Sequence, residues 1–192
     1  DFQVQTGVTR QARRIVLYGP GGVGKSTLAA NMSQVGIKPL FLDLAHGTED
    51  LDTARVAIES FDDVRSALAA DDLWEGFGAV VIDTVTDCEE MISQWVCRNI
   101  PHGEKSAKVI KSIDDYGWGK GYRHTYETAL CLFGDLDRHI RAGRHVVVIA
   151  HECVSNVPNP GGEDFIRYEP RLQAPKNGKD SIRHRLKKWC GD

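Results

Sequence analysis

The residues with the clearest chemical potential lie in one short stretch, GPGGVGKST, at positions 19–27. It fits the pattern G-x-x-x-x-G-K-[ST] of a P-loop, with an apolar run before it and a helical pattern after it. Glycine lacks a Cβ atom, so the backbone can adopt positive φ angles and turn successive N–H groups toward a phosphate. The stretch predicts a nucleotide-binding loop made of Gly19, Gly21, Gly22, Val23, Gly24, Lys25, Ser26 and Thr27.

Two side chains of this loop and one carboxylate beyond it are candidates for chemistry at a bound nucleotide. Lys25 is expected to reach the β- and γ-phosphates, and the Ser26 hydroxyl is expected to ligate Mg²⁺. Thr27 either faces the α-phosphate or supports the turn. The segment AVVID at 79–83 has four apolar residues followed by a carboxylate, which is the Walker B pattern. It predicts Asp83 as a metal-shell ligand at the tip of a strand.

A histidine and an acidic segment supply two further catalytic candidates. His151 follows the apolar run HVVVIA at 145–150, where it is expected either to sense the γ-phosphate or to act as a hydrogen-bonding cap. The run PLFLDL at 39–44 predicts a buried strand containing Asp43, and the polar segment after it includes Glu49. Carboxylates at strand ends beside a nucleotide are where such folds keep catalytic groups.

Basic and aromatic residues gather in two segments that lack a clear period. Between 99 and 122, lysines interleave with Tyr116, Trp118 and Tyr122, which is the composition of a surface that binds single strands. A helix and turn that pack Trp118 into the domain would explain the same composition. The second segment, 152–179, is basic and leads into a basic helix. The candidate DNA-binding residues are Lys105, Lys108, Lys111, Trp118, Lys120, Arg167, Arg171, Lys176 and Lys179.

The elements that must position these groups alternate along the chain. Apolar runs predict strands at 15–18, 39–44, 79–83 and 145–150. Helical patterns predict helices after the P-loop, at 60–70, after position 84, at 123–142 and from 180 onward. This order predicts an α/β fold with a mostly parallel sheet flanked by helices. Residues 1–13 fit a short strand, an arm or a loosely held terminus, and 14–192 form one nucleotide-binding domain.

Local signals refine these elements. Ser60 and Asp63 form a capping-box pattern, and Asp180 is placed to cap the last helix. Thr84 either assists Asp83 or caps the helix that follows it. Residues 152–179 predict a loop or an extended hairpin with a short strand near Phe165.

Composition excludes several classes of protein. The 192 residues carry a net charge of -3, so no strong overall attraction to nucleic acid is expected, and any such argument rests on local segments. Five cysteines, without a C-x-x-C pair, favour reduced buried thiols over a zinc site or a disulfide framework. The chain shows no signal peptide and no apolar run of membrane-spanning length, so a cytoplasmic protein without a membrane partner is expected.

With these motifs in hand, the chain resembles the RecA-like P-loop ATPases, and in particular the phage-encoded Sak-type group of recombination and single-strand annealing. The strings that carry the resemblance are LYGPGGVGKSTLA, PLFLDL, AVVIDT, DYGWGKGY, VVVIAH and the closing R-x-x-L-K-K-W helix. The resemblance implies ATP and Mg²⁺ as cofactors, single-stranded DNA as partner, and mobile DNA-binding loops after the Walker B strand and after the His151 strand. It also implies a ring or filament in which Arg167 and Arg171 or the basic tail serve a neighbour's phosphates. A phage single-strand binding protein as further partner, and the bacterial host cytoplasm as location, follow from the same likeness.

Two departures from the family pattern stand out. Ala45 occupies the position, two residues after Asp43, where the family commonly has a glutamate that polarises the attacking water. Alanine cannot do general-base work. Either Glu49, Asp50 or His46 substitutes, or the chain hydrolyses ATP slowly. The sequence also stops at 192, where the family continues with another core strand. We therefore expect an ATP-dependent single-stranded-DNA-binding protein of recombination or annealing, or alternatively a nucleotide-gated loader with negligible hydrolysis.

Overall fold

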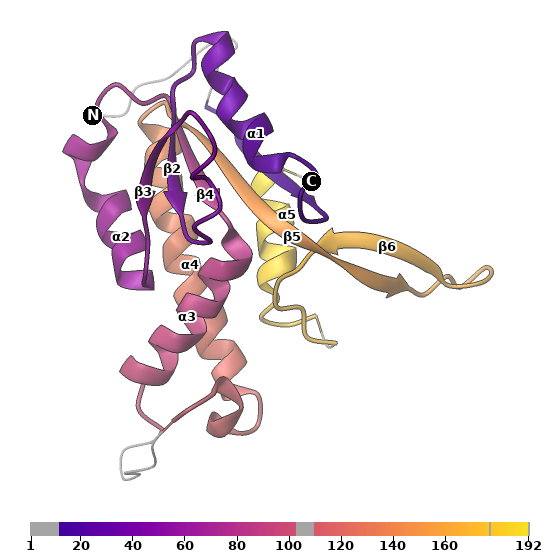
Figure 1. Ribbon diagram of the computed structural model, residues 1–192. Coiled ribbons are helices and arrows are strands. Elements are labelled where there is room, and N and C mark those ends of the chain that lie inside the picture. Colours follow the sequence, from indigo (N-terminus) through magenta and orange to yellow (C-terminus); the bar gives the residue numbers. More distant parts are fainter. Residues whose placement is uncertain (1–11, 103–109, 177, 192) are drawn as a thin grey trace, which may run out of the picture.

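The computed structural model describes residues 12–102, 110–176 and 178–191, and it is built around one central sheet (Figure 1). Five parallel strands lie in the order β1-β5-β4-β2-β3, and β6 pairs with β5 in the antiparallel sense. Their bounds are β1 Arg14–Gly19, β2 Pro39–Asp43, β3 Ala54–Ala57, β4 Ala79–Asp83, β5 His145–Val157 and β6 Phe165–Pro170. The predicted α/β class with a mostly parallel sheet is confirmed.

Helices cover both faces of this sheet. The structure has α1 Lys25–Ala30, α2 Phe61–Ala69, α3 Val85–Asn99, α4 Lys120–Arg141 and α5 Ile182–Cys190. Short 3-10 turns complete them at η1 Asn31–Val35, η2 Asp71–Trp74 and η3 Ile113–Tyr116. None of the helices within the described ranges is long and apolar enough to cross a membrane.

The strands feed two hydrophobic cores, because successive side chains of a strand point to opposite faces of the sheet. Leu40, Leu42, Val80 and Ile82 belong to the larger core, which is shared with α2, α3, α4 and α5. Phe41 and Val81 belong to a smaller core together with Ala29 of α1. Both faces of β2 and β4 are thus buried, which is why their sequences are continuous apolar runs rather than alternating ones.

Parallel pairing brings the chemical candidates to one edge of the sheet. Asp43 at the end of β2 lies opposite Asp83 at the end of β4. On the other side, Gly19 at the end of β1 lies opposite His151 in β5. The carboxyl ends of the strands therefore place the start of the P-loop, two carboxylates and the histidine along one edge.

Several predicted boundaries shift. Strand β3 is absent from the sequence prediction, and β5 runs past the predicted end at 150 to Val157, forming a ribbon with β6. The extended hairpin predicted as one alternative for 152–179 is confirmed. The predicted cap Asp180 is wrong, because Ser181 accepts the His184 N–H and caps α5. The predicted cap Ser60 and the capping alternative for Thr84 are confirmed by bonds from the backbone N–H groups three residues on.

The cysteine prediction holds in part. All five lie in described ranges and form no disulfide, and Cys88 is buried. Cys131, however, is exposed on α4, so burial does not extend to every thiol.

The start of α4 presses closely against η3, and this contact yields a stability prediction. A Cβ atom at Gly121 would lie 1.9 Å from the Ile113 carbonyl oxygen. We expect Gly121→Ala to lower the free energy of unfolding by about 1–3 kcal/mol through overpacking. A Cβ at Gly134, on an exposed part of the same helix, would meet nothing within 4 Å. Gly134→Ala should stabilise the protein by about 0.5–1 kcal/mol. Urea unfolding measures the free energy of unfolding of both variants. Equal changes at the two positions would refute the close contact at Gly121.

Candidate nucleotide site and basic segments

The P-loop adopts the backbone that its glycines predict. Gly22 and Gly24 have φ angles of 74° and 90°, in the left-handed region. Gly24 is the N-cap of α1, so the turn passes directly into the helix that starts at Lys25. The Lys25 ammonium folds back over the loop and donates to the carbonyl oxygens of Gly19 at 2.9 Å and Pro20 at 2.8 Å. The cation therefore stands at the mouth of the loop.

The two predicted metal-shell residues are in direct contact. The Ser26 hydroxyl donates to Asp83 Oδ2 at 2.5 Å. Burial raises the pKa of the Asp83 carboxyl, the hydrogen bond from Ser26 lowers it, and the carboxylate of Asp43 raises it further. A hydroxyl and a carboxylate are hard oxygen ligands of the kind that Mg²⁺ selects, and a cation there would relieve the repulsion between the two aspartates. These two residues fit a magnesium ion.

Asp43, by contrast, is occupied by its own loop. Its carboxylate accepts the Thr48 hydroxyl at 2.5 Å and the N–H groups of Gly47 and Thr48 at 3.3 Å. The residue is only 3% exposed. Three donors from the following segment keep this carboxylate in a structural role, which is to fix the turn after β2.

The turn after β2 carries the position where a glutamate was expected. The Leu44 N–H donates to the Asp83 carbonyl at 2.8 Å, so Ala45 comes directly after the residue that pairs with the end of the Walker B strand β4. Ala45 and Glu49 are both exposed. Glu49 lies farther along this turn, next to Thr48, and its catalytic role stays a prediction.

His151 is not at the end of its strand. Its backbone N–H donates to the Thr86 hydroxyl at 3.1 Å, and its carbonyl accepts the Arg171 N–H at 2.8 Å. The side chain is half-buried beside the first glycine of the P-loop. The backbone of this residue thus ties β5 to α3 and to the segment after β6, while γ-phosphate sensing by its imidazole stays a prediction.

The first basic segment places its aromatic residue in solvent. Trp118 is 99% exposed, so the alternative in which it packs into the domain is wrong. Lys120 begins α4, and Lys111 is exposed just before η3. The candidates Lys105 and Lys108 lie outside the described residues. The three described candidates, Lys111, Trp118 and Lys120, are thus all exposed and lie between the end of α3 and the start of α4.

The second basic segment is divided between a ribbon and a loop. Arg167 is exposed on β6, in the ribbon that stands away from the body of the protein (Figure 1). Arg171 directly follows β6, and Lys176 and Lys179 lie on the loop before α5. Exposed apolar side chains share the ribbon with Arg167; they are Val154, Phe165, Ile166 and Tyr168.

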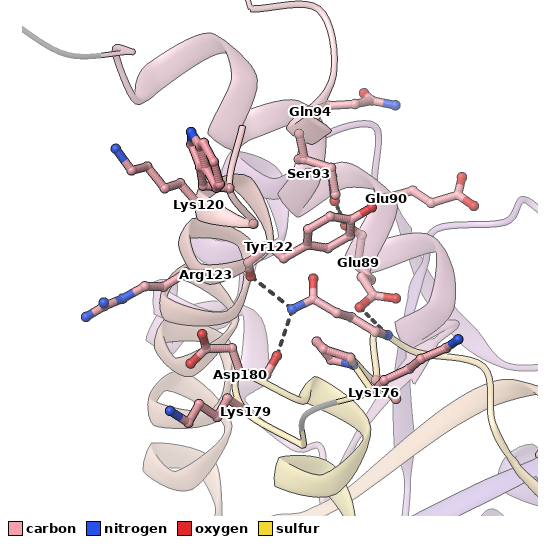
Figure 2. Close-up of a pocket in the computed structure, with 16 residues that line it drawn as sticks. Glu89, Glu90, Ser93, Gln94, Lys120, Tyr122, Arg123, Lys176, Lys179 and Asp180 are labelled. Atoms are coloured by element: carbon pink, nitrogen blue, oxygen red, sulfur yellow. Dashed lines mark hydrogen bonds between the residues drawn. The ribbon is translucent and has the colours of Figure 1, made fainter. Parts of the chain in front are cut away.

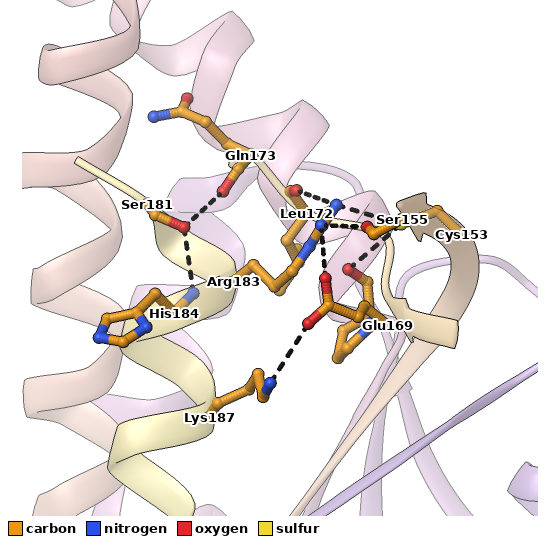
Figure 3. A network of polar contacts seen from close by, with 10 residues as sticks. Cys153, Ser155, Glu169, Leu172, Gln173, Ser181, Arg183, His184 and Lys187 are labelled. Carbon is orange, nitrogen blue, oxygen red and sulfur yellow. Dashed lines mark hydrogen bonds and ion pairs between the residues drawn. The ribbon is translucent and has the colours of Figure 1, made fainter. Parts of the chain in front are cut away.

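A polar network fixes the base of this ribbon to α5 (Figure 3). The Arg183 guanidinium donates to Glu169 at 3.1 Å, to the Ser155 hydroxyl at 2.9 Å and to the Cys153 sulfur at 3.1 Å. Lys187 also pairs with Glu169 at 3.2 Å. Burial raises the pKa of the Glu169 carboxyl, but hydrogen bonds with Ser155 and Lys187 and the charges of Lys187 and Arg183 hold it below its ordinary value. Arg183 and Lys187 therefore act as anchors of the ribbon rather than as parts of an open basic surface.

Two residues that the sequence analysis did not single out connect the basic segments to α3, the helix that follows the Walker B strand β4. Glu89, in the second turn of α3, accepts the Gln173 N–H at 2.7 Å. The Gln173 side chain donates to the carbonyls of Tyr122 at 2.9 Å and Asp180 at 2.7 Å. Glu89 and Gln173 are 84 positions apart, and no local pattern in either segment signals such a pairing.

Burial raises the pKa of Glu89 to about 7, and the Gln173 N–H and the charge of Arg183 oppose this rise. Its ordinary value is 4.5. Between these values the folded protein keeps a proton that the unfolded chain releases, so stability falls as the pH rises. We expect Glu89→Gln to remove a loss on the order of 2 kcal/mol over that interval.

Urea midpoints at pH 5 and pH 7.5 measure this difference between wild type and variant. The glutamine oxygen can still accept the Gln173 N–H, so the comparison isolates the charge. The urea midpoint of Glu89→Gln should rise relative to that of the wild type between pH 5 and pH 7.5. An unchanged difference between the two midpoints would contradict the prediction.

The match to a family model agrees with the P-loop geometry. The family described as AAA domain matches residues 11–183. No curated protein is similar enough to count as a match. Solved structures that match include a KaiC-like protein from the hyperthermophilic archaeon Pyrococcus horikoshii, with 12% identity, a TM-score of 0.43, and coverage of 88% of each chain. A likeness this distant adds nothing to the functional argument.

Proposed function

Because the chain belongs to the AAA-domain family of P-loop ATPases, in which the loop binds nucleotide, we propose that it is an ATP-dependent protein that binds single-stranded DNA during recombination or strand annealing. The observation that carries the proposal is the fully exposed side chain of Trp118, two residues before Lys120 at the start of α4. Stacking on an aromatic ring and pairing of lysines with phosphates are the two contributions that bind single strands without sequence preference.

In this proposal the nucleotide site controls the DNA site. Lys25 binds the β- and γ-phosphates, and Ser26 and Asp83 hold Mg²⁺. The metal supplies charge neutralisation at the phosphates. Asp83 is followed by Thr84, which caps α3 through the Asp87 N–H at 3.2 Å. A change at Asp83 is therefore passed to the first turns of α3.

Helix α3 touches the second basic segment at two points. The Thr86 hydroxyl contacts the Arg171 carbonyl at 3.3 Å, and Glu89 holds Gln173. Both contacts lie within the first two turns of the helix, close to the nucleotide. They support a route by which ATP binding orders the basic segments and hydrolysis releases them.

Titration of a labelled oligonucleotide at low salt tests this function, with and without a nonhydrolysable ATP analogue. We expect binding that needs the analogue and weakens steeply as salt rises, because phosphate contacts release counterions. ATP turnover should rise when single-stranded DNA is added. No DNA binding in the presence of the analogue would overturn the proposal.

A nucleotide-gated loader that hydrolyses ATP negligibly is the second candidate, and Ala45 favours it. The residue comes directly after the one that pairs with the end of the Walker B strand β4, but it carries no group that could orient water. Protein that binds ATP tightly, turns it over at the background rate and retains a protein partner only with ATP would select this function over the first.

We also propose assembly into a ring or filament. The ribbon of β5 and β6 exposes Ile166 at 66% and Tyr168 at 59%, and α1 exposes Leu28 at 60%. Two different apolar surfaces on one chain suit a head-to-tail contact between copies. In such a contact the ribbon would bring Arg167 to a neighbour. Light scattering with the ATP analogue should show a larger species, and Ile166→Asp should abolish it.

A further inference from the structure

A pocket of about 1000 Å³ opens between α3, the start of α4 and the loop before α5 (Figure 2). Tyr122 and Glu89 lie near its centre in this view, with Lys120, Arg123 and Lys176 around them. No P-loop residue lines it. Its volume is at the upper end of the range found for small-molecule sites, which is enough for a nucleotide.

Trp118 lines this pocket and is held in solvent by a constrained backbone. Its φ angle is 52°, and those of Gly117 and Gly119 on either side are 67° and 72°. A large residue with positive φ is a genuine outlier, and such outliers cluster at ligand sites. The most exposed large apolar side chain of the described residues therefore also costs backbone strain.

The loop that displays Trp118 has a firm base. Asp115 accepts the Ser112 N–H at 3.0 Å in the capping box of η3, and the Tyr116 hydroxyl donates toward the Val96 carbonyl at 2.9 Å. The close approach of Gly121 to Ile113 adds a third constraint. Because these contacts fix both sides of the loop, the exposed indole is part of a defined surface.

The rest of the lining supplies complementary polar groups. Glu89 is bonded to the loop through one carboxylate oxygen, Oε1. The cations that line the pocket are Lys120, Arg123, Lys176 and Lys179. Two further carboxylates, those of Glu90 and Asp180, offset part of this charge. An aromatic plane, a carboxyl oxygen as acceptor and cations match three features of a nucleotide, which are the face of its base, the exocyclic amino group that some bases carry, and the phosphate.

We propose that this pocket holds one nucleotide unit, with its base stacked on Trp118, its amino group facing Glu89 and its phosphate facing Lys120 and Lys176. For a unit within a strand, the inference rests on the DNA-binding function proposed above. A free mononucleotide presents the same chemistry. Cytosine is the better probe than thymine, because it carries an exocyclic amino group that can donate a hydrogen bond to a carboxyl oxygen.

Two strands of equal length test the proposal, one of cytosines and one of abasic sites, which carries the same backbone charge. Binding is followed by fluorescence anisotropy with the P-loop saturated by the ATP analogue. We expect the cytosine strand to bind about tenfold more tightly than the abasic strand, and to quench the emission of Trp118.

Trp118→Gly is the decisive variant, because glycine accepts the φ angle at this position without strain and the protein stays folded. It should abolish the preference for bases while leaving the thermal midpoint unchanged or higher. Lys120→Gln should weaken binding of both strands. Its matched control is Arg141→Gln, an exposed cation about 32 Å away at the other end of α4, which should have no effect.

Deoxycytidine monophosphate, added with the P-loop saturated, distinguishes the two sources. Quenching by this nucleotide without strand binding would keep the pocket and overturn the DNA-binding function. Strand binding with equal affinity for abasic DNA, undisturbed by Trp118→Gly, would overturn the pocket and keep that function. If neither strand binding nor quenching is observed, both the pocket and the DNA-binding function are overturned.

Discussion

Replacement of Lys25 by alanine should lower the affinity for ATP about a hundredfold. The ammonium now satisfies the carbonyls of Gly19 and Pro20, and on nucleotide binding it would exchange them for phosphate oxygens. Hydrogen bonds to charged groups contribute about 1.5–3 kcal/mol each, with bonds between two charged groups at the upper end, so exchanging two ammonium–carbonyl bonds for two ammonium–phosphate bonds gains about 3 kcal/mol. That free energy is close to two factors of ten in affinity.

Calorimetric titration measures this affinity directly, and thermal unfolding offers a second readout. Saturating ATP should raise the melting temperature of the wild type but leave that of Lys25→Ala almost unchanged. Lys38→Ala is the matched control, because Lys38 is exposed and packs on Phe77 at 4.6 Å rather than near the loop. Unchanged ATP affinity in Lys25→Ala would refute the nucleotide site.

The parts of the fold that the sequence predicts are those in which one local signal dominates. The strands β2 and β4 are buried on both faces, so their apolar runs are unambiguous. The P-loop glycines demand a specific backbone, and Gly22 and Gly24 adopt it. Thr84 and Ser60 lie just before helices, where a hydroxyl replaces a missing backbone partner.

The missed parts depend on long-range pairing. Strand β3 is a short edge strand of four residues whose sequence, ARVA, is compatible with several structures. The ribbon half of β5 is half-buried or exposed throughout, so its side chains carry no clear burial signal and only pairing with β6 defines it. The contact between Glu89 and Gln173 depends on the fold as a whole, because it joins segments that are distant in the chain.

For the candidate site, the sequence predicted residue types better than their surroundings. It identified Ser26 and Asp83 separately, and the structure brings them into contact at 2.5 Å. It left Trp118 open between the core and the surface, because glycines beside an aromatic residue suit both. Only the three-dimensional positions of η3 and α4 decide that this ring lies in solvent.

The same edge of the sheet bears on the second candidate function, in which nucleotide binding is separate from hydrolysis. Asp43 accepts three hydrogen bonds from its own turn, and Asp83 is engaged with Ser26. Asp43 is therefore committed to its own turn and Asp83 to the proposed metal site, and we assign the orientation of water to neither. The neighbouring position, Ala45, is exposed and has room for a longer side chain.

Ala45→Glu is accordingly expected to raise ATP turnover about a hundredfold, the lower end of what a positioned general base contributes. A steady-state phosphate-release assay measures the gain, and ATP affinity should change little because the P-loop is untouched. Ala45→Gln is the control, since its side chain has nearly the same shape but no basic oxygen. If the glutamate and glutamine variants turn over ATP alike, the activating group comes from elsewhere, and Glu49 or a residue of a neighbouring copy becomes the candidate. A large gain restricted to glutamate would mean that this chain has a complete phosphate and metal site and lacks only the base.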